Sequence, residues 1–197
     1  MNQNKLKAKD LITIAIFTVV FVIATFACVM ALSMTVVGYP FLASASGLVC
    51  GVIWLYMRLK VPKRFTVLLQ SIVCALLFFC IGAGWFIASG IVVGGALAEL
   101  ITSAGHYKSF KFTMIGYAVY GFCFHWGAFL MVILARDYYY DYALTNGTPQ
   151  QHLDALMPLM SWQLLLGAGV FAVVGAVLGM LLGRRLLKKH FVKAGML

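Results

Sequence analysis

The sequence has 197 residues, of which 63% are hydrophobic and 10% are charged, and its mean hydropathy is +0.99. Soluble domains are about 45–50% apolar and about 25% charged, so this composition excludes an ordinary soluble protein and indicates one that crosses a membrane several times. The net charge of +10 does not indicate nucleic-acid binding, because the basic residues fall in short clusters between apolar segments. The five cysteines lie inside apolar segments without a CxxC pair, which indicates neither a metal site nor a disulfide framework.

The first predicted element is a polar, lysine-rich tail over residues 1–10, which we expect to be cytoplasmic. The run from about Leu11 to Ser33 is long enough for a transmembrane helix, which needs about 20 apolar residues to cross roughly 30 Å of hydrocarbon. No small-residue cleavage site is evident before the next apolar segment. We therefore interpret this run as an uncleaved first span rather than a signal peptide.

Five more apolar segments follow along the chain. Their approximate bounds are 41–57, 65–81, 85–103, 112–135 and 162–182. The second and third of the six spans are short for a full crossing, so we expect tilt, re-entry or bounds that differ by a few residues there. The chain is thus predicted to be all-α, with a single integral membrane domain over residues 1–197 that forms a bundle of six transmembrane helices.

The basic residues predict how this bundle is oriented. When the connections are assigned alternately to two sides, every Lys and Arg except Arg136 falls on one side. Because cytoplasmic loops of membrane proteins carry an excess of Lys and Arg, both termini are predicted to be cytoplasmic, with residues 184–197 as a basic tail. The loop over residues 137–161 is then expected to be extracellular and ordered, with a short helix over about Gln150 to Met160.

Small residues recur every four positions in three of the spans. They are Gly175, Gly179 and Gly183 in the sixth span, Gly90 and Gly94 in the fourth, and Ala27 and Ala31 in the first. Such spacing lets membrane helices approach closely, which matters because packing must replace the hydrophobic effect between them. We predict helix contact faces at these positions, and packing inside one bundle is favoured over a subunit interface.

Glu99 is an acidic residue inside a predicted span, where charges are rare and costly. It lies about five residues, or roughly 8 Å, from the predicted cytoplasmic end of its helix. One interpretation is a carboxylate that is paired near His106 or Lys108. The alternatives are a contact with a cytoplasmic partner and a role in gating.

A group of polar and aromatic residues is predicted near the extracellular side. His125 and Arg136 are 11 residues apart, close to three helical turns, so on one helix they would share a face. If that face is turned to the bundle, it lines a small-molecule site, because such sites combine apolar walls with a few polar groups. The candidate substrate-binding residues are Trp85, His125, Trp126, Arg136, Tyr139, Trp162 and Gln163.

The same residues also have ordinary structural interpretations. His125 would form a hydrogen bond to a neighbouring helix, and the tryptophans would be anchors at the membrane interface. If they do bind a ligand, Arg136 indicates an anionic group and the aromatic residues indicate a flat ring.

Catalytic motifs are absent from the sequence. It contains no HExxH, no GxSxG, no paired-carboxylate motif and no glycine-rich phosphate loop with a lysine. We therefore expect no enzymatic activity, no metal and no cofactor. Energy for transport against a gradient would have to come from a partner or an ion.

Two phrases of the sequence resemble a known family. The opening KLKAKDLITIAIFTVVF, which includes Lys7 to Ile12, and GGALAEL, from Gly94 to Leu100, are similar to the S components of energy-coupling factor (ECF) transporters, in particular the Trep_Strep group. The resemblance covers nearly the whole chain. It implies a substrate-binding subunit in a prokaryotic cell membrane that captures a small micronutrient or vitamin-like molecule from outside. It also implies a membrane T subunit and two cytoplasmic ATPases as partners, with the S component toppling in the bilayer to release its ligand.

The resemblance also implies a docking face on the first span. S components commonly dock to the T subunit through an AxxxA pattern nearer the cytoplasm. Here Ala15 is followed four positions later by Val19, whereas the full pattern, Ala27 and Ala31, lies farther from that side. The docking role is therefore carried over to Ala15 and Thr18, with Glu99 as a further candidate. The alternative for Ala15 and Thr18 is packing within the bundle.

Other functions stay open from the sequence alone. An autonomous secondary transporter or channel would relay protons through Glu99 and His125. A small membrane enzyme or an accessory assembly subunit is a third possibility, although the sequence lacks a catalytic constellation. In each case the surrounding partner is membrane lipid.

Overall fold

The computed structural model describes residues 5–33, 35–188 and 192, without the side chain of Tyr39. The first four residues of the N-terminal tail lie outside this part, as do Lys189 and Lys193 of the predicted basic tail. The described chain is helical and contains no strand, so the predicted all-α class is confirmed. Its elements are α1 (Ala8–Ser33), η1 (Tyr39–Phe41), α2 (Leu42–Lys60), α3 (Thr66–Cys80), α4 (Gly84–Ala104), α5 (Phe110–Leu134), α6 (Arg136–Thr145), α7 (Gln150–Leu156), η2 (Met157–Leu159) and α8 (Trp162–Leu186).

Five of the described helices, α1, α2, α4, α5 and α8, are long and apolar enough to cross a membrane. Helix α3 is apolar but has only 15 residues, or roughly 22 Å at 1.5 Å per residue, which is less than the roughly 30 Å of hydrocarbon. The short third span was therefore predicted correctly. Helix α2 was predicted too short, because it continues to Lys60 and has 19 residues.

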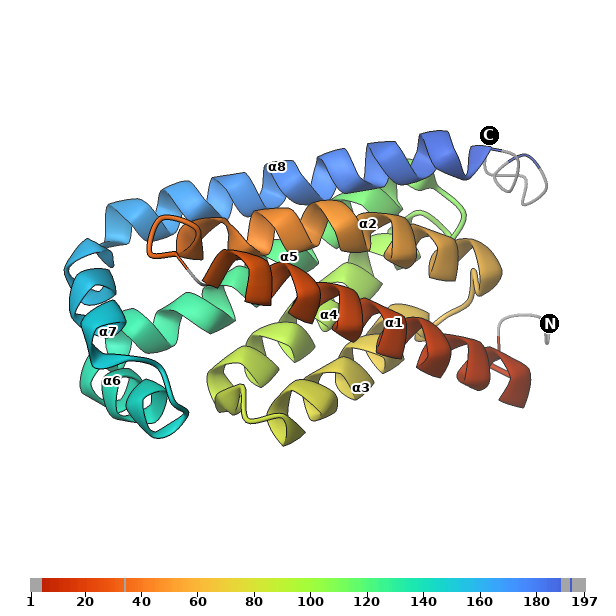
Figure 1. Cartoon of the computed structure of the whole chain (residues 1–197). Helices are drawn as coiled ribbons and strands as arrows, with labels where there is room; N and C mark the ends of the chain where they lie inside the picture. The colour runs from red at the N-terminus through yellow and green to blue at the C-terminus, as the bar shows by residue number, and fades with distance from the viewer. Residues whose placement is uncertain (1–4, 34, 189–191, 193–197) are drawn as a thin grey trace.

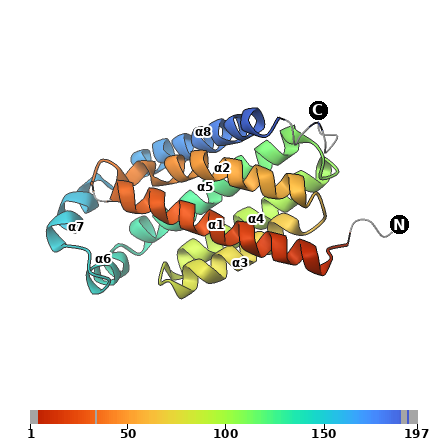
Figure 2. The ribbon, with the colours of Figure 1, turned by 45° about the vertical axis from the view of Figure 1, so that its right-hand side comes forward.

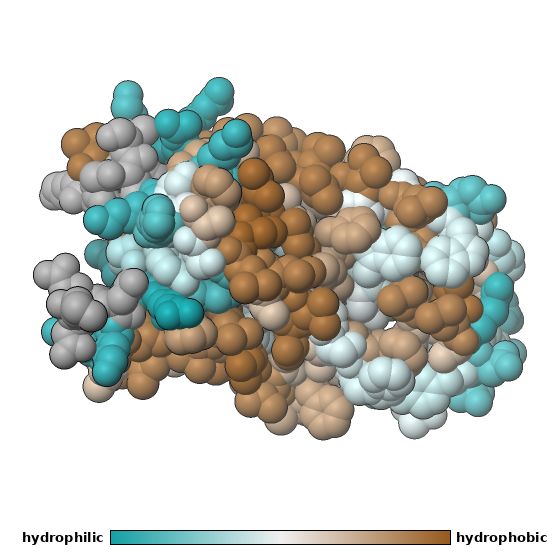
Figure 3. Space-filling view, turned by 180° about the vertical axis from the view of Figure 1, so that it is seen from behind, coloured by the Kyte–Doolittle hydropathy of each residue, from teal (hydrophilic) through white to brown (hydrophobic). Residues whose placement is uncertain are grey.

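The six apolar helices form one elongated bundle whose two ends differ in character (Figures 1 and 2). One end carries the start of α1, the α2–α3 and α4–α5 connections and the end of α8, and we call it the basic end. Its described basic residues are Lys5, Lys7, Lys9, Arg58, Lys60, Lys63, Arg64, Lys108, Lys111, Arg184, Arg185 and Lys188. The other end, which we call the loop end, carries α6 and α7 and the exception Arg136. Seen from behind, a brown belt of apolar side chains separates the hydrophilic residues of the two ends (Figure 3).

The middle of the bundle is packed with aromatic side chains. The Trp54 ring lies 5.0 Å from that of Tyr117 and 4.7 Å from that of Tyr120, between ring centroids. Both tyrosines are buried, and the Tyr117 hydroxyl donates a 3.0 Å hydrogen bond to the Gly47 carbonyl on α2. Buried aromatic pairs of this kind add stability beyond the area that they bury, so this layer fixes how α2 and α5 face each other.

Glycines set the closest contacts between helices. A Cβ atom on Gly179 of α8 would lie 2.5 Å from the Leu48 carbonyl oxygen of α2, and one on Gly90 of α4 would lie 2.6 Å from the Cys123 carbonyl oxygen of α5. These distances leave no room for a side chain. The predicted contact faces on the fourth and sixth spans are therefore confirmed as packing inside one chain, whereas Ala27 and Ala31 are exposed on α1.

Candidate functional site

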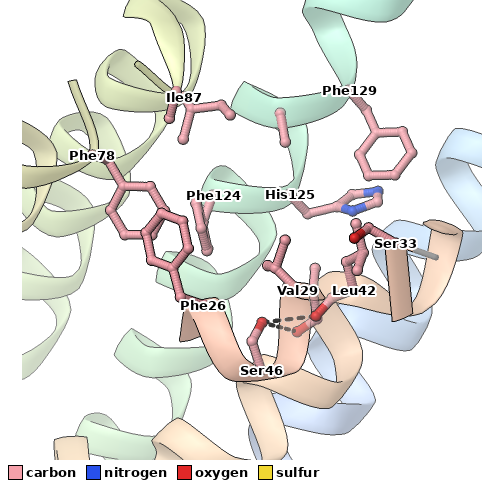
Figure 4. Close-up of a pocket in the computed structure, with 13 residues that line it drawn as sticks. Phe26, Val29, Ser33, Leu42, Ser46, Phe78, Ile87, Phe124, His125 and Phe129 are labelled. Atoms are coloured by element: carbon pink, nitrogen blue, oxygen red, sulfur yellow. Dashed lines mark hydrogen bonds between the residues drawn. The ribbon is translucent and has the colours of Figure 1, made fainter. Parts of the chain in front are cut away.

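A cavity of about 210 Å³ lies in the half of the bundle nearer the loop end. It is enclosed by the last turns of α1, the first turns of α2, the α3–α4 turn and the middle of α5 (Figure 4). Three of its lining residues, Ser33, Ser46 and His125, are polar, and none is charged. The site is therefore an apolar space with a small number of hydrogen-bonding groups, as small-molecule sites commonly are.

The α3–α4 turn brings two helices to the cavity. Gly82 and Gly84 have positive φ angles of 86° and 80°, a conformation that glycine adopts at little cost. The chain can therefore reverse direction between Cys80 and Gly84. This reversal places Phe78 of α3 and Ile87 of α4 on the cavity wall.

His125 is the predicted site residue that reaches this cavity. Its side chain on α5 is only 1% exposed, and its Nε2 atom lies 3.2 Å from the carbonyl oxygen of Leu165 on α8. The other ring nitrogen, Nδ1, is buried without a hydrogen-bond partner. The two interpretations of His125 from the sequence, a hydrogen bond to a neighbouring helix and a place on the wall of a site, are therefore compatible, because the residue does both.

The remaining lining divides the cavity into two ends (Figure 4). At one end the rings of Phe26 and Phe78 are stacked with centroids 5.4 Å apart, and Phe124 meets Phe78 edge-on at 5.5 Å. At the other end lie His125 and Ser33, and the His125 ring packs 4.4 Å from that of Phe129. One end of the cavity is therefore formed by three phenylalanine rings, and the other carries the polar groups of His125 and Ser33 beside Phe129.

The predicted tryptophans lie away from this cavity. Trp126 is on a different face of α5, with its ring 6.0 Å from that of Trp162, and its buried indole N–H has no partner. Trp85 is 56% exposed and stacks on Phe86. Gln163 borders a separate, open depression at the loop end beside Val37 and Phe41.

Arg136 and Tyr139 belong to the packing of the loop end. Arg136 is the first residue of α6 and donates a hydrogen bond to the Met157 carbonyl in η2. Tyr139 is buried in a cluster that includes Leu153 and Leu156 of α7. Neither residue lines the cavity between α1 and α5.

The expected alignment of His125 and Arg136 on one helix face is wrong. Helix α5 ends at Leu134, and Ala135, with φ −129° and ψ 55°, separates it from α6. The helical repeat of α5 does not continue through residue 135, so the number of turns after His125 does not predict the direction of Arg136. This break has no proline or glycine to announce it in the sequence.

Glu99 lies on α4 near the basic end, and its carboxylate is bonded to the start of α3. It accepts hydrogen bonds from the backbone N–H groups of Phe65 (2.6 Å), Val67 (3.0 Å) and Leu68 (3.3 Å). The first N–H groups of a helix have no partner inside it, and the residue before α3, Phe65, provides no side-chain cap. Glu99 is only 6% exposed and caps α3 from a neighbouring helix, instead of pairing with His106 or Lys108.

A network of polar contacts surrounds this cap. The buried Arg58 donates to the carbonyl groups of Val61, Lys63 and Tyr107, each at 3.3 Å. The Lys63 ammonium lies 2.6 Å from the Asp10 carboxylate on α1. Burial raises the pKa of the Tyr107 hydroxyl, and the negative charge of Glu99 raises it further. The connection between α2 and α3 is therefore tied to α1, α2 and α4.

The two candidate docking residues on α1 point in different directions. Ala15 is exposed, whereas Thr18 is fully buried and donates a 2.7 Å hydrogen bond to the Ile14 carbonyl of its own helix. Of the two, only Ala15 is accessible to a partner.

Several cavity residues were not singled out from the sequence, among them Ser33, Ser46, Phe26, Phe78 and Phe124. The serines carried a usable signal, because they are polar residues within or beside apolar segments. The phenylalanines carried none, since the chain has 15 of them. Among the described residues, no group of three or more His, Cys, Asp or Glu side chains is placed to hold a metal ion.

Comparison with protein families gives one match. A family model described as "Hypothetical bacterial integral membrane protein (Trep_Strep)" matches residues 8–193. No curated protein and no solved structure matches the chain.

Proposed function

We propose that this chain, which belongs to the Trep_Strep family of bacterial integral membrane proteins, is the substrate-binding S component of an energy-coupling factor transporter. In this proposal the protein captures a small micronutrient or vitamin-like molecule from outside the bacterial cell. A T subunit in the membrane and two cytoplasmic ATPases, which the sequence resemblance implies, then drive its release inside. Membrane lipid surrounds the apolar belt.

The observation that carries the proposal is the cavity near the loop end. Its volume of about 210 Å³ exceeds that of the roughly 150 Å³ engineered cavities that bind benzene, so a molecule with one or two rings fits. Its walls come from five different helices, which is typical of ligand sites inside bundles.

The charge distribution supports capture from outside. If the basic end is cytoplasmic, as the excess of Lys and Arg favours, the cavity lies in the half of the bundle that faces the exterior. A binding subunit needs its site on that side. Of the predicted docking residues, Ala15 is on the exposed face of α1 and is the one that we assign to a contact with the T subunit.

The arrangement of the polar residues favours binding over catalysis. His125 and Ser33 both line the cavity, but the ring nitrogen of His125 that carries a hydrogen bond is directed to the Leu165 carbonyl and not to a carboxylate. The triad of a serine hydrolase requires an acidic residue at that position. We therefore propose that the protein has no enzymatic activity.

The alternative, a proton relay through Glu99 and His125, gains no support from the geometry. Both oxygens of Glu99 accept hydrogen bonds from the N-terminus of α3. A carboxylate whose two oxygens are both bonded to backbone N–H groups serves as a helix cap. We therefore assign Glu99 a structural role.

Two linked experiments test the proposal. First, small molecules that stay bound through purification are identified by mass spectrometry, with Ala128→Phe to fill the cavity and Ala27→Phe as a control on the exposed face of α1. We expect a ligand in the wild type and the control but not in Ala128→Phe. Second, uptake of that molecule into proteoliposomes is measured with and without the T subunit and ATPases. Uptake by this chain alone would contradict the proposal and favour an autonomous transporter.

A further inference from the structure

Resting on the proposed function, we infer that the cavity selects an uncharged molecule with an aromatic ring and a hydrogen-bond donor, and that this donor faces His125 and Ser33. Three features of the cavity carry the inference. They are the absence of charge, the unpaired polar groups of His125 and Ser33, and the position of the phenylalanine rings.

The absence of charge excludes an ionic ligand. No charged residue lines the cavity, and Arg136, which indicated an anionic ligand from the sequence, bonds to Met157 outside it. An ion that leaves water for an apolar space without a counterion loses far more free energy than a neutral group of the same shape. A carboxylate is therefore expected to bind much more weakly than its neutral analogue.

His125 determines which polar group the ligand presents. The Leu165 carbonyl can only accept a hydrogen bond, so the Nε2 atom that lies 3.2 Å from it must carry the proton. In the neutral ring the other nitrogen, Nδ1, is then an acceptor, and it is buried without a partner. A ligand N–H or O–H group would satisfy it, whereas a second acceptor would not.

Ser33 provides a second hydrogen-bonding group at the same end of the cavity (Figure 4). Within the described part of the chain its hydroxyl makes no hydrogen bond, so it can accept from or donate to a ligand. By contrast, the Ser46 hydroxyl already donates to the carbonyl groups of Leu42 and Ala43. Ser33 and His125 are therefore the specificity-determining residues for the polar group.

The phenylalanines determine where the ring lies. Phe26, Phe78 and Phe124 form the opposite end of the cavity, with successive centroids 5.4 Å and 5.5 Å apart. A flat ring inserted there makes offset or edge contacts with them, which aromatic pairs prefer. The molecule is thus oriented with its ring among the phenylalanines and its donor toward α5 and the end of α1.

Three probes of nearly equal shape test this inference. They are 4-fluorobenzamide, which is neutral and has a donor, methyl 4-fluorobenzoate, which is neutral without a donor, and 4-fluorobenzoate, which is anionic. Binding to the purified full chain is followed by fluorine NMR, and partitioning into empty detergent micelles is subtracted. We expect the ester to bind about fivefold more weakly than the amide, because one neutral hydrogen bond is lost. We expect the anion to bind about a hundredfold more weakly.

Matched variants locate the effect in the cavity. Ser33→Ala is expected to weaken binding of the amide severalfold and binding of the ester by less, because only the amide can also donate to the hydroxyl. Ser89→Ala, which removes an exposed hydroxyl that bonds to Phe86 within α4, is expected to change neither. Ala128→Phe is expected to abolish binding of both.

The outcomes separate this inference from the proposed function. Equal binding of the amide and the anion would overturn the inferred ligand class and leave the transport role standing. Probe binding that survives Ala128→Phe would overturn the inference and would also remove the cavity as support for the proposed function. Uptake without the T subunit and ATPases would overturn the transport role and leave the ligand class standing.

Discussion

The Glu99 carboxylate on α4 lies 3.0 Å from the backbone nitrogen of Val67 in the first turn of α3. The two residues are 32 positions apart, so a tertiary contact does the work that a local side chain performs at most helix starts. The acidic Glu99 inside an apolar helix is thereby explained by its role as the cap of α3.

Replacement of Glu99 tests this cap. Glu99→Ala leaves the N–H group of Phe65 before α3 and those of Val67 and Leu68 in its first turn without an acceptor, so we expect the free energy of unfolding to fall by about 3 kcal/mol. Glu99→Gln retains one acceptor oxygen and should cost less. Thermal unfolding of the purified protein in detergent measures both, with Asp141→Ala on the exposed face of α6 as control. A Glu99→Ala variant as stable as this control would contradict the assignment.

The contact between α2 and α8 should be equally sensitive to a single methyl group. A Cβ atom on Gly179 would overlap the Leu48 carbonyl oxygen, whereas one on Gly167 of the same helix would meet nothing within 4 Å. We therefore expect Gly179→Ala to destabilise the protein by about 3 kcal/mol. Gly167→Ala should be neutral or slightly stabilising, because alanine favours the helix. Similar unfolding temperatures for the two variants would contradict this prediction, because they would show that α2 and α8 can move apart to accept the methyl group without a loss of stability.

The orientation in the membrane is open to labelling in cells. Asn146 after α6 and Lys108 between α4 and α5 are exposed at opposite ends of the bundle. We expect a membrane-impermeant maleimide to label Asn146→Cys in intact cells and Lys108→Cys only after permeabilisation. The reverse pattern would place the basic end outside and remove the argument for capture of an external ligand.

Arg136 should contribute to the loop end rather than to ligand affinity. Arg136→Gln removes a hydrogen bond between α6 and the Met157 carbonyl. Because Arg136 is exposed, we expect a loss of no more than about 1 kcal/mol in overall stability. Limited proteolysis should instead reveal faster cleavage between α6 and α7. A large loss of probe binding without faster cleavage would return Arg136 to the binding site.

The helices could be predicted from the sequence because each span requires a long apolar run, and such runs are conspicuous. Errors at the ends have local causes. Helix α1 starts at Ala8 rather than at the predicted Leu11. The side chain of Asp10 in its first turn accepts a hydrogen bond from the Lys7 N–H group, which lies just before the helix. Helix α2 continues past Met57, because Arg58 is buried and bonded to carbonyl groups instead of marking the membrane surface.

The cavity could be predicted only in part. His125 stood out as a polar residue in an apolar helix, and the structure places it on the wall. The other walls depend on which face of each helix turns inward, and this is decided by contacts such as that of Gly90 with Cys123. Arg136 was misplaced because the backbone break at Ala135 depends on the packing of α6 against α7 and η2.

The polar network at the basic end has a consequence for how a ligand enters and leaves. Asp10, Arg58 and Glu99 hold the α2–α3 connection from three helices, whereas the described hydrogen bonds of the α3–α4 turn are local. The α3–α4 turn can therefore move with little loss of hydrogen bonds to other helices, whereas the α2–α3 connection at the basic end cannot. If the protein delivers a ligand across the membrane as proposed, the loop end of the bundle must therefore open first to one side of the membrane and then to the other.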